Sequence, residues 1–345
     1  MRNINRIKTN KERRKMALNK EIWLNTIQEN FYPDDSFASK SVDDSSFVTN
    51  KTVHIPNAGK PSGVEVNRKE KPAKISERTD QDLTYDIDEL TSNPIYIPNV
   101  DTVELSYDKR QSVIANDRQE LQRVANQNLL YRWAKGAGLI KTTGAAADVH
   151  TSDVATGQRK KFSKAEVLSA MVRFNKDNVP MLGRYMLLDA AMYAELLDDL
   201  TDKELSAFLN SANAQEGIIG RLYGFSFMQR SEVLRVDGKN AILPWTEEDS
   251  ADESAAALAW QEGCVSRAIG DVKMFQQMDD PTYYGDIYSF LVRTGGSMRR
   301  YDKKGVLLIA EDKVTDRDHQ VPLRCSGLHN DLKTKKDTDV TKSKD

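Results

Sequence analysis

The side chains best suited to metal binding or proton transfer are few in this chain of 345 residues. It has four histidines and two cysteines, Cys264 and Cys325. His319, Cys325 and His329 lie near one another in sequence, as the nitrogen and sulfur ligands of a metal ion often do. No fourth ligand accompanies them, and the segment around them is too polar to build a fold. We therefore expect no metal site in this chain.

Carboxylates are a second group that could support chemistry, since paired acids can exchange protons when burial separates their pKa values. An acidic cluster is formed by Glu247, Glu248, Asp249, Asp252 and Glu253. It precedes an alanine-rich stretch, which predicts a helix from about Ser250 through Trp260 to about Ala268. Because negative charge is favourable at the start of a helix, we interpret the cluster as a solvated helix start.

Motifs of common enzyme classes are absent from the sequence. There is no G-x-x-x-x-G-K-[ST], no G-x-G-x-x-G after a strand, no H-E-x-x-H and no G-x-S-x-G. We therefore expect no catalytic, cofactor-binding or metal-binding residue, and we predict that the protein is not an enzyme and needs no cofactor. The secondary structure elements that the sequence predicts are therefore more informative about function.

Residues 111–135 predict one long helix, which ends at Gly136 and Gly138. Its apolar residues recur at helical spacing on one face. They are Ile114, Leu121, Val124, Ala125, Leu129 and Trp133. Asp117 and Glu120 either form a capping pair at its start or lie on the first turns of a longer helix.

Three further helices have clear start signals. Ser163 and Glu166 form an S-x-x-E capping box, and Thr201 and Glu204 form another. Between these two boxes, Asp189 precedes an apolar pattern of helical spacing and is the expected N-cap. These signals place the three helix starts to within a residue or two.

Strands are predicted between and after these helices. The segments 185–188, 217–228, 287–293 and 305–311 have strand-like apolar patterns, and we expect Asp302–Gly305 to form the turn between the last two. Helices and strands alternate without visible repeats, so the fold class is predicted to be α+β.

The most unusual stretch is residues 51–98, which contains five of the ten prolines. Alternating patterns predict strands near 53–55 and 83–87, while residues 57–80 carry almost no large apolar side chains. An isolated hairpin is marginally stable in water. A hairpin this long is therefore expected either to be disordered or to pack on a neighbouring molecule.

Charges along this hairpin are segregated. Residues 67–78 have five basic and two acidic side chains, a net +3, while residues 80–89 have five acidic side chains and none that is basic, a net −5. The pattern fits either a solvated loop or two limbs that meet complementary charge on other subunits. The candidate inter-subunit contacts are Lys60, Arg68, Lys69, Lys71, Lys74, Arg78, Asp80 and Asp82.

The two ends of the chain are polar. Residues 1–15 contain seven basic residues and one acidic residue, a net +6. This segment is either an upstream extension or disordered tail before a true start at Met16, or a basic arm that contacts nucleic acid or a partner. Residues 312–345 contain eight basic and seven acidic residues and few apolar ones, which predicts a disordered tail.

Composition excludes several classes of protein. The formal net charge is −2, so bulk charge does not make the chain a nucleic-acid binder. No window of about 18 apolar residues occurs, and no apolar signal segment follows the charged start, so we expect neither a membrane span nor secretion. Two cysteines fit a reducing compartment such as the bacterial cytoplasm. Extended arms without reactive groups favour self-assembly.

Several sequence segments, and the order in which they occur, resemble those of the major capsid proteins of tailed bacteriophages with the Hong Kong 97-type (Johnson) fold. TVHIPNAGKPSG, LTYDIDEL and TVELSYDKRQSVI resemble the run through the extended loop to the spine helix. VPMLGRYMLLDAAMYAELL and GIIGRLYGFSFMQRS resemble axial-domain segments, and YGDIYSFLVRTGGSMRRYDKKGVLLIAE resembles the closing peripheral-domain hairpin. The resemblance covers about residues 17–311.

The resemblance implies a division of the chain. Residues 1–50 would be an N-terminal arm, 51–95 the extended loop and 180–280 the axial domain, while the basic residues 1–15 of the arm and the tail 312–345 lie outside the resemblance. The peripheral domain would comprise 96–179 and 281–311, with the spine helix near 111–135.

The implied function is structural. Copies of the chain would assemble through hexamers and pentamers into the icosahedral head shell that encloses double-stranded DNA. The implied partners are the chain itself, the portal and DNA packaged without sequence specificity, with either a separate scaffolding protein or none, and no membrane. The protein would reside in the virion after assembly in the cytoplasm of a bacterial host. An encapsulin-like bacterial compartment shell of the same fold is the alternative.

Overall fold

A computed structural model describes residues 36–49, 51–59, 64, 66–69, 72, 75, 80–98 and 109–314. The chain divides into two units, Met1–Lys313 and Val314–Asp345, and all but the first residue of the second lies outside the described residues. The predicted basic segment 1–15 lies outside the described residues. The predicted disordered tail also lies outside them, apart from residues 312–314.

The largest sheet has eight strands in the order β11-β12-β10-β15-β13-β14, with β18 paired to β15 and β7 paired to β18. Its strands are β7 (Gly138–Lys141), β10 (Arg184–Leu188), β11 (Gly220–Leu222), β12 (Phe225–Gln229), β13 (Leu234–Val236), β14 (Ile242–Leu243), β15 (Ser254–Gln261) and β18 (Val306–Ala310). The pairs β10–β12 and β7–β18 are parallel, and the other pairs are antiparallel.

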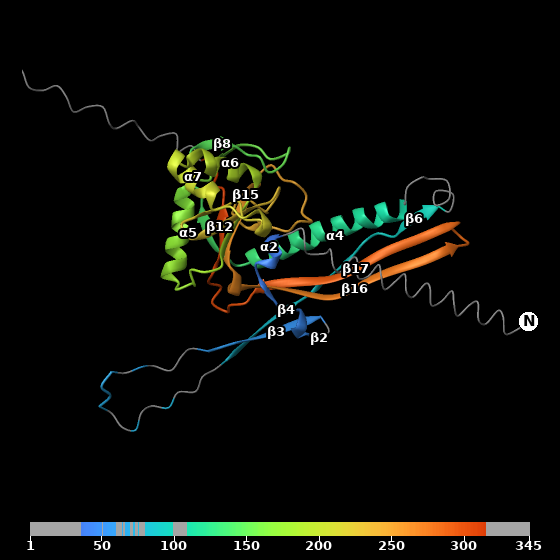
Figure 1. Cartoon of the computed structure of the whole chain (residues 1–345), viewed down its shortest axis with the longest axis horizontal. Helices are drawn as coiled ribbons and strands as arrows, with labels where there is room; N and C mark the ends of the chain where they lie inside the picture. The colour runs from blue at the N-terminus through green and yellow to red at the C-terminus, as the bar shows by residue number, and fades with distance from the viewer. Residues whose placement is uncertain are drawn as a thin grey trace, which may run out of the picture. The chain divides into compact units, whose positions relative to one another are not determined.

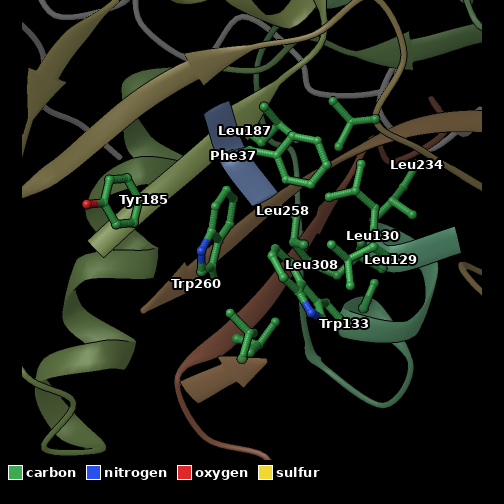
Figure 2. Close-up of a cluster of buried hydrophobic side chains, with 14 of the residues drawn as sticks. Phe37, Leu129, Leu130, Trp133, Tyr185, Leu187, Leu234, Leu258, Trp260 and Leu308 are labelled. Carbon is green, nitrogen blue, oxygen red and sulfur yellow. The ribbon is translucent and has the colours of Figure 1, made fainter. Parts of the chain in front are cut away.

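The two faces of this sheet are both covered, because alternate residues of a strand point to opposite faces. On β10, Met186 and Leu188 belong to a core shared with three helices, one before β10 in the chain and two after it. These helices are α5 (Lys164–Lys176), α6 (Ala190–Asp199) and α7 (Asp202–Asn210) (Figure 1). Tyr185 and Leu187 face the other core, with Trp133 of α4 (Lys109–Ala134) and Phe37 of α2 (Ser36–Ser39), as Figure 2 shows.

A second sheet is built on a long antiparallel hairpin of β16 (Val265–Asp280) and β17 (Gly285–Met298). It also contains β1 (Val42–Asp43), β5 (Asp88–Thr91) and β6 (Ile95–Pro98). Helix α4 lies alongside the hairpin (Figure 1), and its Leu121 and Ala125 form a core with Phe290 of β17. The approach is close enough that a Cβ at Gly296 would overlap the Leu129 side chain, so glycine is needed there.

The remaining elements are small. A three-stranded sheet is formed by β2 (Val48–Thr49), β3 (Thr52–Asn57) and β4 (Gln81–Asp86), and a two-stranded sheet by β8 (Ala146–Asp148) and β9 (Gln158–Lys160). The described chain also has the 3-10 helices η1 (Ser45–Phe47), η2 (Ala214–Glu216) and η3 (Glu262–Cys264). The predicted strands near 53–55 and 83–87 are confirmed as the pair β3–β4.

The predicted helix starts are confirmed. Both capping boxes are formed, at Ser163 with Glu166 and at Thr201 with Glu204. The Asp189 carboxylate accepts a hydrogen bond from the Met192 backbone N–H at 2.7 Å and caps α6. The long helix is confirmed as α4, and it begins at Lys109, so Asp117 and Glu120 lie inside it rather than at its start.

The predicted helix from Ser250 to Ala268 is wrong. This segment forms β15, η3 and the start of β16. Alanine favours helices, but tertiary context overrides this weak preference. In β15 every residue from Ser254 to Trp260 is buried, since the strand pairs with β10 and β13 along one edge and with β18 along the other. The small side chains allow the cores on both faces to approach it.

The predicted pairing of the last two strands is also wrong, although both strands exist. β17 pairs with β16, whereas β18 crosses to the eight-stranded sheet and pairs with β15 and β7. The expected turn at Asp302–Gly305 therefore connects two sheets. Local sequence locates a turn but does not specify which edge the next strand joins.

Candidate assembly surfaces

The predicted extended-loop contacts are partly described. Arg68, Lys69, Asp80 and Asp82 lie in the described part of the chain, while Lys60, Lys71, Lys74 and Arg78 lie outside it. Because the structure describes a single chain, whether these eight side chains contact another subunit stays a prediction.

The two acidic residues hold the base of the hairpin together. Asp82 Oδ2 lies 2.9 Å from His54 Nδ1 across the β3–β4 pair. Asp80 Oδ1 accepts a hydrogen bond of 2.9 Å from the backbone N–H of Gly59. Part of the negative charge on this limb therefore closes the hairpin within one chain.

The root of the hairpin is anchored to the body of the chain. Val53, Ile55, Tyr85 and Ile87 form a small buried core with Ala268 of β16. This core ties the β3–β4 pair to the second sheet and fixes the direction in which the hairpin leaves it.

A polar clamp adds to this anchor just after the hairpin. Asp88 accepts hydrogen bonds from Asn128 Nδ2, at 2.6 Å, and from Arg132 Nε, at 2.8 Å, both on α4. A second Arg132 nitrogen donates to the other Asp88 oxygen, so the arginine is bidentate, which fixes orientation as well as adding energy. The hairpin root is thus held by both a sheet and a helix.

Beyond this root the described apolar side chains have no packing. Val64 is 96% exposed, Val66 is 83% exposed and Ile75 is 97% exposed. Large apolar groups this exposed gain nothing within one chain, and burying each fully against a neighbour is worth roughly 1.5–3 kcal/mol. The hairpin therefore presents contact groups that a single chain does not use.

An aromatic patch at the turn of the β16–β17 hairpin was not found by sequence reasoning. It consists of Tyr96, Tyr283 and Tyr284; the ring centroids of Tyr96 and Tyr283 are 6.3 Å apart, and the Tyr96 hydroxyl lies 3.4 Å from the Tyr284 carbonyl oxygen. Tyr284 is the most exposed, at 78%. Aromatic residues and methionine are enriched at protein interfaces. The sequence feature that could have indicated the patch is the pair Tyr283 and Tyr284 between β16 and β17, but this pair is equally compatible with an ordinary turn.

A buried electrostatic cluster joins β9, α6 and the end of β18. Arg159 donates two hydrogen bonds to Glu195, at 2.9 and 2.7 Å, and its Nη1 lies 2.8 Å from Glu311 Oε1. His150 Nε2 lies 3.0 Å from Asp189 Oδ2, and its Nδ1 lies 3.8 Å from Glu311 Oε1. The Glu311 side chain is fully buried, and the cluster cross-links three elements.

Burial raises the pKa of Glu311 to about 8, although Arg159 and His150 oppose the shift. The pKa of His150 is also raised; burial lowers it, but the hydrogen bond to Asp189 and the charge of Glu311 outweigh burial. Both groups bind protons more tightly in the folded chain than in the unfolded chain. Their contribution to stability is therefore present at low pH and is lost as the pH rises.

Glu311→Gln should flatten the pH dependence of folding. In the wild-type chain, the free energy of unfolding should fall by a few kcal/mol as the pH rises from about 5 to above 8, and most of this fall should vanish in the variant. Urea unfolding of the unassembled subunit at several pH values measures the pH dependence of the free energy of unfolding. Glu204→Gln is the matched control, since the pKa of Glu204 is lowered to about 2 and its contribution is constant in this range. An unchanged slope in Glu311→Gln would contradict the prediction.

The acidic cluster near residue 250 has a structural role. Arg235 Nη1 donates to Asp249 at 2.5 Å and to the buried Glu253 at 3.0 Å, and Arg235 Nη2 donates to the Glu247 carbonyl oxygen at 2.8 Å. The predicted helix start is thus replaced by a loop bound to β13 through Arg235.

Among the described residues, no group of three or more His, Cys, Asp or Glu side chains is arranged to hold a metal ion, and His319, Cys325 and His329 of the tail lie outside the described part. Within the same residues, no helix combines the length and the apolar character that crossing a membrane requires.

Comparison with solved structures identifies the fold. The capsid structure of cyanophage P-SCSP1u matches with a TM-score of 0.57 and 16% identity, covering 79% of this chain and 86% of that one. The capsid of Ralstonia phage GP4 matches with a TM-score of 0.59 and 10% identity, covering 80% and 88%. Mycobacterium phage Che8 matches with a TM-score of 0.52 and 15% identity, covering 79% and 90%. No protein-family model and no curated protein matches the sequence.

The chain therefore has the α+β fold of tailed-phage capsid proteins, the Hong Kong 97-type fold. The matches cover about four-fifths of this chain and most of each compared chain, so the likeness concerns most of the fold rather than a local motif. The predicted fold class is confirmed.

Proposed function

We propose that this protein is a major capsid protein, copies of which assemble into the icosahedral head shell of a tailed bacteriophage. The observation that carries the proposal is a hairpin anchored firmly at its root whose apolar side chains, Val64, Val66 and Ile75, are almost fully exposed. The role is structural rather than catalytic. The likeness to capsid structures supports the same conclusion.

The functional division follows the sequence prediction. Residues 1–50 serve as an N-terminal arm, 51–95 as the extended loop, 96–179 with 281–311 as the peripheral domain, and 180–280 as the axial domain. Strand pairing suggests two adjustments, because β16 pairs with β17 and β18 pairs with β15. On this basis β16 moves to the peripheral domain and β18 to the axial domain, and α4 is the spine helix.

Assembly proceeds through hexamers and pentamers of the same chain. The eight charged residues of the extended loop, from Lys60 to Asp82, contact neighbouring subunits, and the aromatic patch on the β16–β17 turn supplies a second contact. Many modest contacts repeated by symmetry sum to a stable closed shell. A net charge of −2 allows like subunits to pack without strong repulsion.

The remaining partners follow from the shell. A separate scaffolding protein directs assembly in the cytoplasm of the bacterial host, a portal occupies one vertex, and double-stranded DNA fills the finished virion head. The DNA is bound without sequence readout, since the chain needs only tolerable electrostatics on its inner surface.

Electron microscopy of negatively stained protein, expressed alone and separated by size exclusion, tests the proposal. We expect uniform closed shells, or hexamers where the scaffolding protein is required, and in unassembled protein the first cut of limited proteolysis should fall within residues 57–80. A compact monomer that resists proteolysis there would contradict the proposal. Shells that enclose a protein cargo and no nucleic acid would instead indicate a compartment shell.

A further inference from the structure

A groove of about 860 Å³ lies beside α4, away from the extended loop and the aromatic patch. One wall is the α4 face that carries Tyr131, and the others are the loops around residues 150–154 and 243–249. Trp245 lies in the groove, and 37% of its surface is exposed. The groove thus has aromatic surface available to a ligand.

The groove also carries excess negative charge. Its two arginines are already engaged, Arg123 with Glu120 at 2.6 Å and Arg235 with Asp249 and Glu253. Three other acidic residues line it and are exposed, namely Asp153, Glu232 and Glu247. His150 is paired with Asp189 at 3.0 Å and does not offset them. A ligand with several positive charges is therefore favoured.

The acidic loop is held in place before any ligand binds. Arg235 Nη2 donates a hydrogen bond to the Glu247 carbonyl oxygen, which fixes the backbone and leaves the Glu247 carboxylate exposed. Gln127 Nε2 of α4 donates to Glu232 Oε2 at 3.4 Å and holds that side chain at the opposite wall. A site that is already ordered loses less entropy on binding.

The described chain begins close to this groove. Helix α2 starts at Ser36, and the Phe37 ring packs under the guanidinium of Arg230 at 5.6 Å, directly before the groove residues Ser231 and Glu232. The twenty residues 16–35 span up to about 70 Å when extended. Residues 1–15, with a net charge of +6, are thus able to reach the groove from this point.

We propose that residues 1–15 of this chain dock in the acidic groove beside α4. The arginines of this segment stack on Trp245 and Tyr131, and its lysines pair with Asp153, Glu232 and Glu247. Arginine prefers aromatic faces and pairs readily with carboxylates, which suits a groove that offers both. This inference does not depend on the capsid function, because the segment can dock within one subunit or between two subunits without an assembled shell.

Zero-length carbodiimide coupling of the full chain, followed by mass spectrometry, tests the docking. The reagent joins an amine and a carboxylate that are already in contact, so Lys8, Lys11 or Lys15 should be linked to groove acids. Mixing isotopically light and heavy chains shows whether the segment comes from the same subunit or a neighbour, and either source supports the proposal. Links confined to acids outside the groove would overturn it.

A binding measurement gives an independent test. A fluorescent peptide of residues 1–15 is titrated into the full chain in which the lysines and arginines of that segment are changed to glutamine. The double variant Glu232→Gln and Glu247→Gln should weaken binding by about tenfold, with weaker binding at high salt. The matched control is Asp198→Asn with Asp202→Asn, two exposed acids outside the groove. The proposal would be overturned if both double variants weakened peptide binding equally. It would also be overturned if the peptide bound added DNA but not the protein.

Discussion

Trp133→Ala should lower the free energy of unfolding of the subunit by about 3–5 kcal/mol, as large-to-small changes in a well-packed core do. Trp133 is completely buried, where α4 meets both large sheets. Its ring lies edge-on to Phe37 with centroids 6.0 Å apart, and 5.6 Å from the ring of Trp260 (Figure 2). Loss of this side chain leaves a cavity that rigid strands on either side cannot close.

Two further variants separate packing from hydrogen bonding. Trp133 Nε1 donates a 2.7 Å hydrogen bond to the Ser266 carbonyl oxygen in β16. Trp133→Phe keeps most of the volume but leaves that buried carbonyl without this donor, which costs about 1–3 kcal/mol. Trp245→Ala is the matched control, and because Trp245 is partly exposed it should cost much less.

Urea unfolding monitored by circular dichroism ranks the three variants. The expected order of destabilisation is Trp133→Ala, then Trp133→Phe, then Trp245→Ala. If Trp133→Ala proved no more destabilising than Trp245→Ala, α4 would not be packed between the sheets as described.

Helix positions were predictable because their signals are local. Ser163, Asp189 and Thr201 each mark a helix start through contacts within three residues. The apolar face of α4 was visible as well, since Leu121, Ala125, Leu129 and Trp133 recur at helical spacing and all are buried.

Strand partners were not predictable, because pairing depends on residues far apart in sequence. The alanine-rich stretch 254–261 has the composition of a helix, yet it is the strand on which β10, β13 and β18 all pair. Strand β18 follows β17 closely but joins a different sheet. The local sequence of neither segment specifies the strand with which it pairs.

Candidate contact surfaces were predictable only where composition is unusual. The extended loop was recognisable because so little apolar sequence lies between its two strands. The aromatic patch at the β16–β17 turn was not, because Tyr96 comes together with Tyr283 only through the pairing of β6 with β17. The Arg159 cluster was missed for the same reason, since Glu195 and Glu311 reach it from distant elements.

Deleting residues 60–78 should leave a folded subunit that no longer forms closed shells. The hairpin root is retained in this variant, because Val53, Ile55, Tyr85 and the Asp88 clamp to α4 lie outside the deletion. The deletion removes Val64, Val66 and Ile75, whose exposed side chains contribute nothing to the stability of a single chain. Stability and assembly should therefore respond separately.

Thermal unfolding and analytical ultracentrifugation measure the two responses. The melting transition of the subunit should be unchanged, while the shell-sized species should disappear. The triple variant Val64→Ser, Val66→Ser and Ile75→Ser keeps the loop length and tests whether apolar burial is the cause, with a loss of assembly close to that of the deletion. Normal shells from the deletion would show that the loop is a solvated appendage, and the interfaces of the shell would then have to be sought at the aromatic patch.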